Sequence, residues 1–194
     1  MKFLLNLSGR VDKLSETIGR TIMWLILAAV LLGAGNAIVR KAFQMGSNAL
    51  TDMQWYLFSA VFLLGAGYAF LKNVHVRIDF VSSRLTARSR SWIDIVGIIF
   101  FLTPLCWLLI QTSWPLFVKA WQSGEMSQNV GGLIRWPAYL LVPAGMALLM
   151  LQSASELIKR IAFLRGWIPD PLAHDQEKAD SPAAMLADNP PEKP

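Results

Sequence analysis

Four long apolar runs constrain the fold of this 194-residue chain more than any other feature. Two of them hold no charge, and the other two hold one acid each, Asp94 near the start of the third and Glu156 near the end of the fourth. About 20 helical residues, at 1.5 Å each, cross the roughly 30 Å hydrocarbon layer. The runs do not alternate as barrel strands do, so helices must satisfy the backbone in lipid. We predict transmembrane helices at about residues 21–39, 53–71, 92–118 and 136–158.

The basic residues predict the orientation of these helices. Of the 18 Lys and Arg residues, fourteen lie before the first run, between the second and third, or after the fourth. The positive-inside rule therefore places both termini and the second connection in the cytoplasm. The predicted fold class is an all-α polytopic membrane protein with four transmembrane helices plus amphipathic interfacial helices, N-in and C-in. Cys106 is the single cysteine, which excludes an intrachain disulfide, and we expect it to be buried.

Two segments flank the predicted membrane domain, which covers residues 21–165. Residues 1–20 are too interrupted by charge for a cleavable signal peptide. Their apolar residues recur at helical spacing, which predicts an amphipathic helix on the inner surface. These apolar residues are Phe3, Leu7, Val11, Leu14 and Ile18. Residues 166–194 are rich in Pro, Asp, Glu and Ala, which predicts a disordered cytoplasmic tail.

The stretch Phe70–Arg90 is basic and follows an apolar run directly. Asp79 is placed to cap a new helix there, and the arginines after the run fall on one face of it. We interpret this as an interfacial helix that meets anionic lipid headgroups. The candidate headgroup contacts are Arg77, Arg84 and Arg88. A sharper alternative makes His75 and Asp79 metal ligands or a proton relay, but one His without a second nearby is a weak metal signal.

Polar residues in or beside the spans are few and neutral or close to an end. The amides of Asn36, Gln111 and Gln152 are expected to bond a neighbouring helix rather than a substrate. The absence of histidine from every span excludes a bis-histidine haem subunit. No ionisable residue lies at mid-depth, which argues against an ion pathway through this chain. Glu156 is expected to pair locally with Lys159 and Arg160.

Helix boundaries and packing can also be predicted from short patterns. Thr51 and Gln54 have the spacing of a capping box, which predicts that the second helix starts at Thr51. Pro104 and Pro115 predict a bend in the third span. Paired glycines in the first two spans predict smooth patches where helices approach closely, both within this chain and against other proteins. In the second span these are Gly65 and Gly67.

The segment Trp121–Pro137 lies on the outer side and holds only two charges, Glu125 and Arg135. Its glycines make it flexible or tightly turned. Two interpretations stay open, a plain connection and a docking surface for an extracytoplasmic partner.

Three motifs together carry a resemblance to a known family. They are "DMQWYLFSAVFLLGAGYAFLKNVHVRIDF" from Asp52, "SRSWIDIVG" at the third span and "SGEMSQNVGGLIRWP" before the fourth. On these motifs the chain resembles the small membrane (Q-type) subunit of TRAP transporters, the tripartite ATP-independent periplasmic transporters. The resemblance covers Ser8 to about Arg165 and is nearest to the mannitol, chloroaromatic or keto-acid branch.

The resemblance implies a non-enzymatic subunit of the bacterial inner membrane. Its expected partners are a large multi-span permease subunit, a periplasmic solute-binding protein and membrane lipids, and no nucleic acid. No cofactor is expected in this chain, with Na⁺ sites in the large subunit and bound phospholipid as a candidate ligand. The expected interface or structural residues, with the two glycines above, are Asp52, Trp55, His75, Arg77, Asp79, Asp94, Glu125 and Pro137.

Two alternative functions follow from other classes of protein. A self-contained homo-oligomeric channel or small transporter would need a polar pathway of its own, which the spans do not provide. A lipid-modifying enzyme at the Phe70–Arg90 surface would need a catalytic constellation, and His75 with Asp79 is too small a set to supply one.

Overall fold

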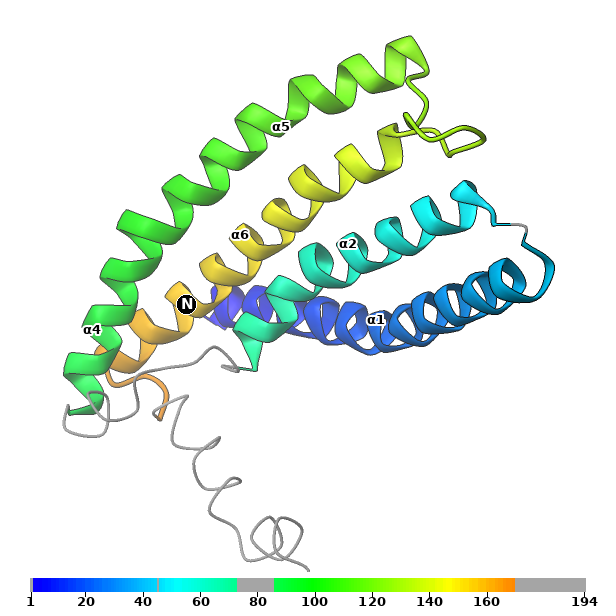
Figure 1. Cartoon of the computed structure of the whole chain (residues 1–194). Helices are drawn as coiled ribbons and strands as arrows, with labels where there is room; N and C mark the ends of the chain where they lie inside the picture. Colours follow the sequence, from blue (N-terminus) through cyan, green and yellow to red (C-terminus); the bar gives the residue numbers. More distant parts are fainter. Residues whose placement is uncertain (1, 45, 73–85, 170–194) are drawn as a thin grey trace, which may run out of the picture.

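The computed structural model describes residues 2–44, 46–72 and 86–169, and helices make up nearly all of them (Figure 1). Within these ranges, four helical stretches are long and apolar enough to cross a membrane. They are α1 (Lys2–Phe43), α2 (Asn48–Leu71), the continuous run of α4 (Ala87–Gly97), η1 (Ile98–Leu102) and α5 (Thr103–Ser123), and α6 (Trp136–Leu164). The predicted all-α class with four transmembrane helices is therefore confirmed.

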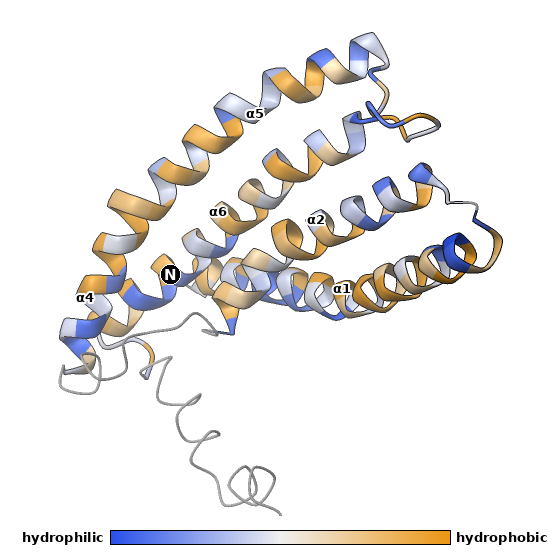
Figure 2. Ribbon diagram, viewed as in Figure 1, coloured by the Kyte–Doolittle hydropathy of each residue, from blue (hydrophilic) through white to orange (hydrophobic). Residues whose placement is uncertain are grey.

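Stretches that follow one another in the chain run in opposite directions, and α5, α6, α2 and α1 lie side by side in that order, so the neighbours α6 and α2 run parallel (Figure 1). α6 is the central element because it packs against α2, α5 and α1. We call the end with connections 44–47 and 124–135 the loop end, and the end where α1 begins and α6 finishes the terminal end. Hydrophobic residues run along the length of the helices, with hydrophilic residues gathered nearer their ends (Figure 2).

α1 is one continuous helix of 42 residues, so no break separates the predicted N-terminal helix from the first span. At 1.5 Å per residue its length is about 63 Å, roughly twice the hydrocarbon thickness. The first turns are amphipathic, as predicted, with Phe3 and Leu7 exposed. Their small polar residues Ser8 and Ser15 are buried, because this side of the helix packs against the end of α6. That contact holds the segment in line with the span.

The predicted start of the second helix at Thr51 is wrong. α2 begins at Asn48, and its N-cap is Ser47, four residues before Thr51, with the side-chain oxygen accepting a 3.4 Å hydrogen bond from the Leu50 N–H. The Thr51 hydroxyl instead accepts a 3.1 Å hydrogen bond from the amide of Asn36 on α1. The Thr51 hydroxyl, which the capping-box spacing assigned to a helix start, is therefore bonded to a neighbouring helix instead.

The third stretch contains the π-helical turn η1 directly before Pro104. Proline has no N–H to donate and its ring clashes with the carbonyl four residues back, so a regular α-helix cannot pass through this position unchanged. The wider turn relieves the clash, and the Thr103 N–H bonds to the Ile98 carbonyl. Pro115 lies inside α5 without interrupting it. The irregularity therefore lies at the first of the two prolines named from sequence.

α2 and α6 approach each other closely at two glycines. A Cβ on Gly145 would lie 2.6 Å from the carbonyl oxygen of Leu63, which leaves no room for any side chain. A Cβ on Gly67 would lie 3.5 Å from the carbonyl oxygen of Leu148, which is ordinary contact. Gly65 faces Ile22 of α1 more loosely, at 3.8 Å. The paired glycines of α2 therefore pack inside this chain, between α1 and α6.

Candidate functional site

The connection between α5 and α6 is an ordered hairpin. Gly124 ends α5 in the left-handed conformation, at φ 61°, which favours glycine. Beyond it the N–H of Ser127 bonds to the Leu133 carbonyl at 2.8 Å, and the N–H of Arg135 bonds to the Glu125 carbonyl at 2.9 Å. A turn closed by Gly132 and Asn129 joins the two sides, at 2.9 Å between nitrogen and oxygen. Residues 125–135 therefore have a defined backbone.

Three side chains of α2 hold this hairpin, and we call Asn48, Asp52 and Tyr56 the loop clamp. The Asn48 amide donates to the Val130 carbonyl at 2.9 Å, and the Tyr56 hydroxyl donates to the Ile134 carbonyl at 3.1 Å. Asp52 accepts twice, from the Asn129 amide at 3.0 Å and from the Leu133 N–H at 3.1 Å. The three residues are four apart, so they share one face of the helix.

The clamp leaves an apolar tip exposed. Val130 at the tip is 91% exposed, although its carbonyl is bonded to α2, and Met126 near the base is 58% exposed. At the base of the hairpin, Arg135 bonds to Glu125 at 2.8 Å. The hydrogen bond to this carboxylate raises the pKa of Arg135 above its ordinary value. The hairpin thus presents apolar side chains on a fixed backbone, beside a neutralised ion pair.

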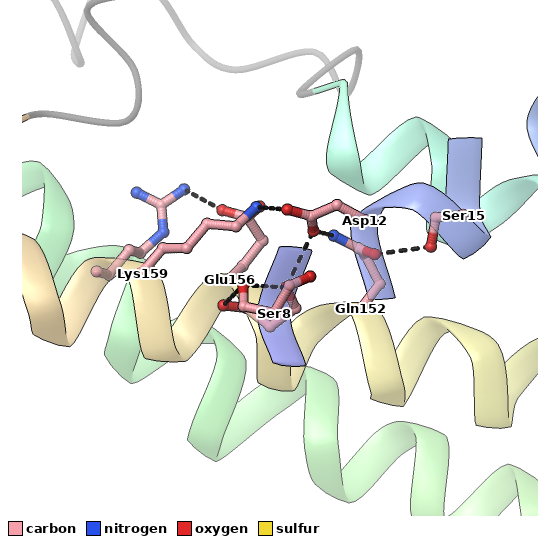
Figure 3. Close-up of polar contacts among 8 residues, drawn as sticks. Ser8, Asp12, Ser15, Gln152, Glu156 and Lys159 are labelled. Atoms are coloured by element: carbon pink, nitrogen blue, oxygen red, sulfur yellow. Dashed lines mark hydrogen bonds and ion pairs between the residues drawn. The ribbon is translucent and has the colours of Figure 1, made fainter. Parts of the chain in front are cut away.

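A second polar cluster joins α1 to α6 at the terminal end (Figure 3). We call it the terminal network, and its members are Ser8, Asp12, Ser15, Gln152, Ser155, Glu156 and Lys159. The Ser15 hydroxyl donates to the Gln152 oxygen at 2.7 Å, and the Gln152 amide donates to Asp12 at 3.0 Å. The Ser8 and Ser155 hydroxyls lie 2.6 Å apart. These bonds fix the first turns of α1 against α6.

Ion pairs in this cluster connect neighbouring helices. Lys159 lies 2.7 Å from both Asp12 and Glu156. Arg160, next along α6, pairs with Asp94 of α4 and lies 3.9 Å from Glu156. The predicted local pairing of Glu156 is confirmed, and the same two cations also reach α1 and α4. The network therefore fastens three helices at the terminal end.

The structure brings some of the expected residues together and separates others. Asp52 belongs to the clamp, Glu125 to the base of the hairpin and Asp94 to the ion pairs of the terminal end. Pro137 is the second residue of α6, where a missing N–H costs nothing. Trp55 is 67% exposed on α2, and Arg88 is exposed on α4. The remaining expected residues, His75, Arg77, Asp79 and Arg84, lie outside the described residues.

Sequence reasoning missed most of the polar residues that organise the two ends. Asn48 and Tyr56 were not singled out, although their four-residue spacing from Asp52 marks one helix face. Ser8, Asp12 and Ser15 form a similar polar stripe on α1. The amides of Asn36 and Gln152 do bond neighbouring helices, as predicted.

The clamp and the network have the chemistry of contact sites. Their groups are carboxylates, amides, hydroxyls and cations that are bonded to one another and hold backbone in place. Within residues 2–44, 46–72 and 86–169, no three His, Cys, Asp or Glu side chains gather as a metal site would require. The two ends can therefore position helices and a loop, and present surfaces to partners.

Comparison with known proteins identifies the family. Neither the curated proteins nor the solved structures searched give a match. The sequence model of the family "Tripartite ATP-independent periplasmic transporters, DctQ component" matches residues 29–163, which cover most of the four-helix bundle. A component of this kind is part of a transporter and is not an enzyme. The chain belongs to the DctQ family, the small membrane component of tripartite ATP-independent periplasmic transporters.

Proposed function

We propose that this chain is a fixed membrane scaffold for the large permease subunit of its transporter and that it helps to dock the periplasmic solute-binding protein. Family membership supports a role within such an assembly. Ionisable side chains occur only near the ends of the four apolar runs, so the chain offers no charged relay at mid-depth. Solute and coupling-ion sites, including any for Na⁺, then belong to the large subunit during ion-coupled import.

We place the bundle in the bacterial inner membrane with the terminal end in the cytoplasm. Fourteen of the 18 Lys and Arg residues lie in the sequence segments before the first span, between the second and third, and after the fourth, which the positive-inside rule assigns to the cytoplasmic side. The loop end then faces the periplasm, where a solute-binding protein would be met. Arg88, exposed at the start of α4, is positioned to contact phospholipid headgroups on the cytoplasmic side.

The loop clamp is the observation that carries the docking role. A plain connection between two helices needs no fixed backbone, yet three α2 side chains hold the hairpin with four hydrogen bonds. A surface that is ordered before binding loses less conformational entropy when the partner arrives. The exposed Val130 at its tip supplies apolar area to bury in such a contact.

A charge at the tip tests the docking role. Val130→Asp should weaken binding of the solute-binding protein to the purified two-subunit membrane complex about tenfold or more, because the carboxylate would be desolvated in the contact. Gln44→Asp is the matched control, since it adds the same charge at an exposed position of the same end. Surface plasmon resonance on complexes in nanodiscs measures both. Equal affinities for the two variants would contradict the docking role.

The scaffold role is tested with the chain alone. We expect the purified chain in sealed vesicles to move no solute and to bind neither solute nor Na⁺ in calorimetry. Transport by the single polypeptide would favour the alternative of a self-contained channel or transporter.

A further inference from the structure

An exposed stripe of large aromatic side chains runs along the α4–α5 stretch. Its members, Phe100, Trp107, Trp114 and Trp121, are seven residues apart and between 52% and 70% exposed. At 3.6 residues per turn, positions seven apart drift by only about 20°, so Trp107, Trp114 and Trp121 form one continuous band along α5. Phe100 precedes them in the π-helical turn η1. The row of residues one position earlier, about 100° around the same helix, is small and buried, at Cys106, Ser113 and Ala120.

One polar side chain interrupts this aromatic band. Gln111 lies between Trp107 and Trp114 on the same face and is exposed. Its neighbour Thr112 satisfies its hydroxyl within the helix, by donating to the Leu108 carbonyl at 2.9 Å. Among the described residues, no hydrogen-bond partner meets the Gln111 amide. We call Phe100, Trp107, Gln111, Trp114 and Trp121 the α5 seam.

Two other amides within the spans, Asn36 and Gln152, show what a satisfied amide requires. Asn36 bonds to Thr51 of α2, and Gln152 bonds to Ser15 and Asp12 of α1. Each one therefore faces a neighbouring helix of the same chain. Gln111 faces outward from a helix that packs on α6 by its other side. An amide left facing hydrocarbon without a partner is costly, whereas one facing a second helix is satisfied.

The outer face of α1 provides a comparison within the same molecule. Trp24, Leu31 and Ile38 are also seven residues apart and are 62% to 72% exposed. The residues between them on that face are Leu, Ala and Gly, with no polar side chain. A face without polar side chains can contact lipid tails without leaving any hydrogen-bonding group unsatisfied. The spacing of exposed apolar residues is the same on both faces, so it cannot distinguish a lipid-facing surface from a protein-facing one. The Gln111 amide is the feature that distinguishes them.

We propose that the α5 seam binds a membrane-spanning helix of the large permease subunit and that Gln111 hydrogen-bonds to a polar group of that helix. The proposal rests on the scaffold role above and names the face that performs it. The aromatic rings supply contact area along the band, and the amide sets the register of the two helices. The wholly apolar face of α1, with Trp24, Leu31 and Ile38, is left to lipid.

Photocrosslinking in the co-expressed two-subunit complex tests which face meets the large subunit. The photoreactive residue p-benzoylphenylalanine replaces Trp107 or Trp114 on the seam, and Leu31 or Ile38 on α1 as the matched control. We expect crosslinks to the large subunit from the two seam positions and none from α1. Crosslinks to a second copy of this chain, crosslinks from α1 instead, or no protein crosslink from the seam would each overturn the proposal.

These outcomes are distinguishable from failure of the scaffold role. If the wild-type chain does not co-purify with the large subunit, both proposals fail. If it co-purifies but the seam yields no crosslink to that subunit, only the assignment of the face fails.

Removing the amide tests the hydrogen bond itself. Gln111→Leu should lower the fraction of large subunit retained on the tagged chain, after dilution in detergent, by about threefold to tenfold, as expected for an interhelical hydrogen bond in a membrane. Thr112→Val is the matched control, because its hydroxyl is bonded within its own helix. Unchanged or increased retention with Gln111→Leu would show that the amide faces lipid and would overturn the proposal.

Discussion

The backbone N–H of Leu133 donates a 3.1 Å hydrogen bond to the carboxylate of Asp52, 81 residues earlier in the chain. The same carboxylate accepts from the Asn129 amide on the other side of the hairpin turn. One buried acid on α2 therefore holds both sides of the hairpin. The hairpin is therefore held by side chains of α2 as well as by its own backbone hydrogen bonds.

Removing this carboxylate should loosen the hairpin without unfolding the bundle. Asp52→Ala leaves two donors without their acceptor, which costs about 1–3 kcal/mol for each buried group that water does not reach. We expect faster amide hydrogen exchange in residues 125–135, measured by mass spectrometry on the purified complex. Met53→Ala, on the adjacent exposed position, is the control and should leave exchange unchanged. Slow exchange in both variants would mean that the hairpin holds its shape without the clamp.

The hairpin turn is also packed tightly against its clamp at Gly132. A Cβ there would lie 2.5 Å from both an Asp52 oxygen and the Ser127 Cβ, so Gly132→Ala must displace the turn. We expect this variant to weaken binding of the solute-binding protein and to expose the hairpin to protease. A Cβ on Gly35 of α1 meets nothing, so Gly35→Ala is the control. If cleavage in the hairpin is as slow as in the control, the turn is not held where we describe it.

The close approach of α2 and α6 makes a separate prediction about stability. In Gly145→Ala the added methyl group would meet the Leu63 carbonyl oxygen at 2.6 Å, and backbone cannot rotate away as a side chain can. The helices must separate, which we expect to cost about 1–3 kcal/mol. Thermal unfolding in detergent, followed by size-exclusion chromatography, should show a lower midpoint than for Gly35→Ala. An unchanged midpoint would contradict the tight packing of this pair.

The number of long apolar helices could be predicted because a helix that crosses lipid needs a minimum length and an apolar composition, and both are visible in the sequence. The same hydropathy did not show that α1 continues through its charged first turns. Those turns stay helical and in line because Ser8, Asp12 and Ser15 meet partners on α6, about 140 residues away. Contacts across such a separation leave no local pattern. The helical spacing of the apolar residues in this segment could be read from the sequence. The contacts of its polar residues with α6 could not.

Helix boundaries and the candidate site were less predictable for a related reason. Ser47 and Thr51 both carry a hydroxyl that can cap a helix, and the capping-box spacing favoured Thr51. Asn36 of α1 decides between them by bonding Thr51. Asp52 was named from the family resemblance, but its hydrogen bonds to the hairpin depend on the fold of α2 beside the α5–α6 connection. The loop clamp therefore exists only where α2 and the α5–α6 connection, two segments far apart in the sequence, come together.

The terminal network makes the last prediction. Lys159 lies 2.7 Å from Asp12 and from Glu156, and its side chain is only 19% exposed. Lys159→Met keeps the apolar stem but leaves two carboxylates facing each other without a cation. Breaking a buried pair in this way costs roughly 3–5 kcal/mol, and the partial exposure of Asp12 should bring the loss to about 2–3 kcal/mol. The variant should therefore unfold at lower temperature in detergent, and protease should cleave the first turns of α1 sooner.

Lys13→Met, beside Asp12 on the exposed side of the helix, is the control. If the loss comes from the unpaired charge, Asp12→Asn combined with Lys159→Met should recover part of it. A double variant that is weaker than Lys159→Met alone would show that Asp12 acts through its bonds to Gln152 and Ser155 rather than through Lys159.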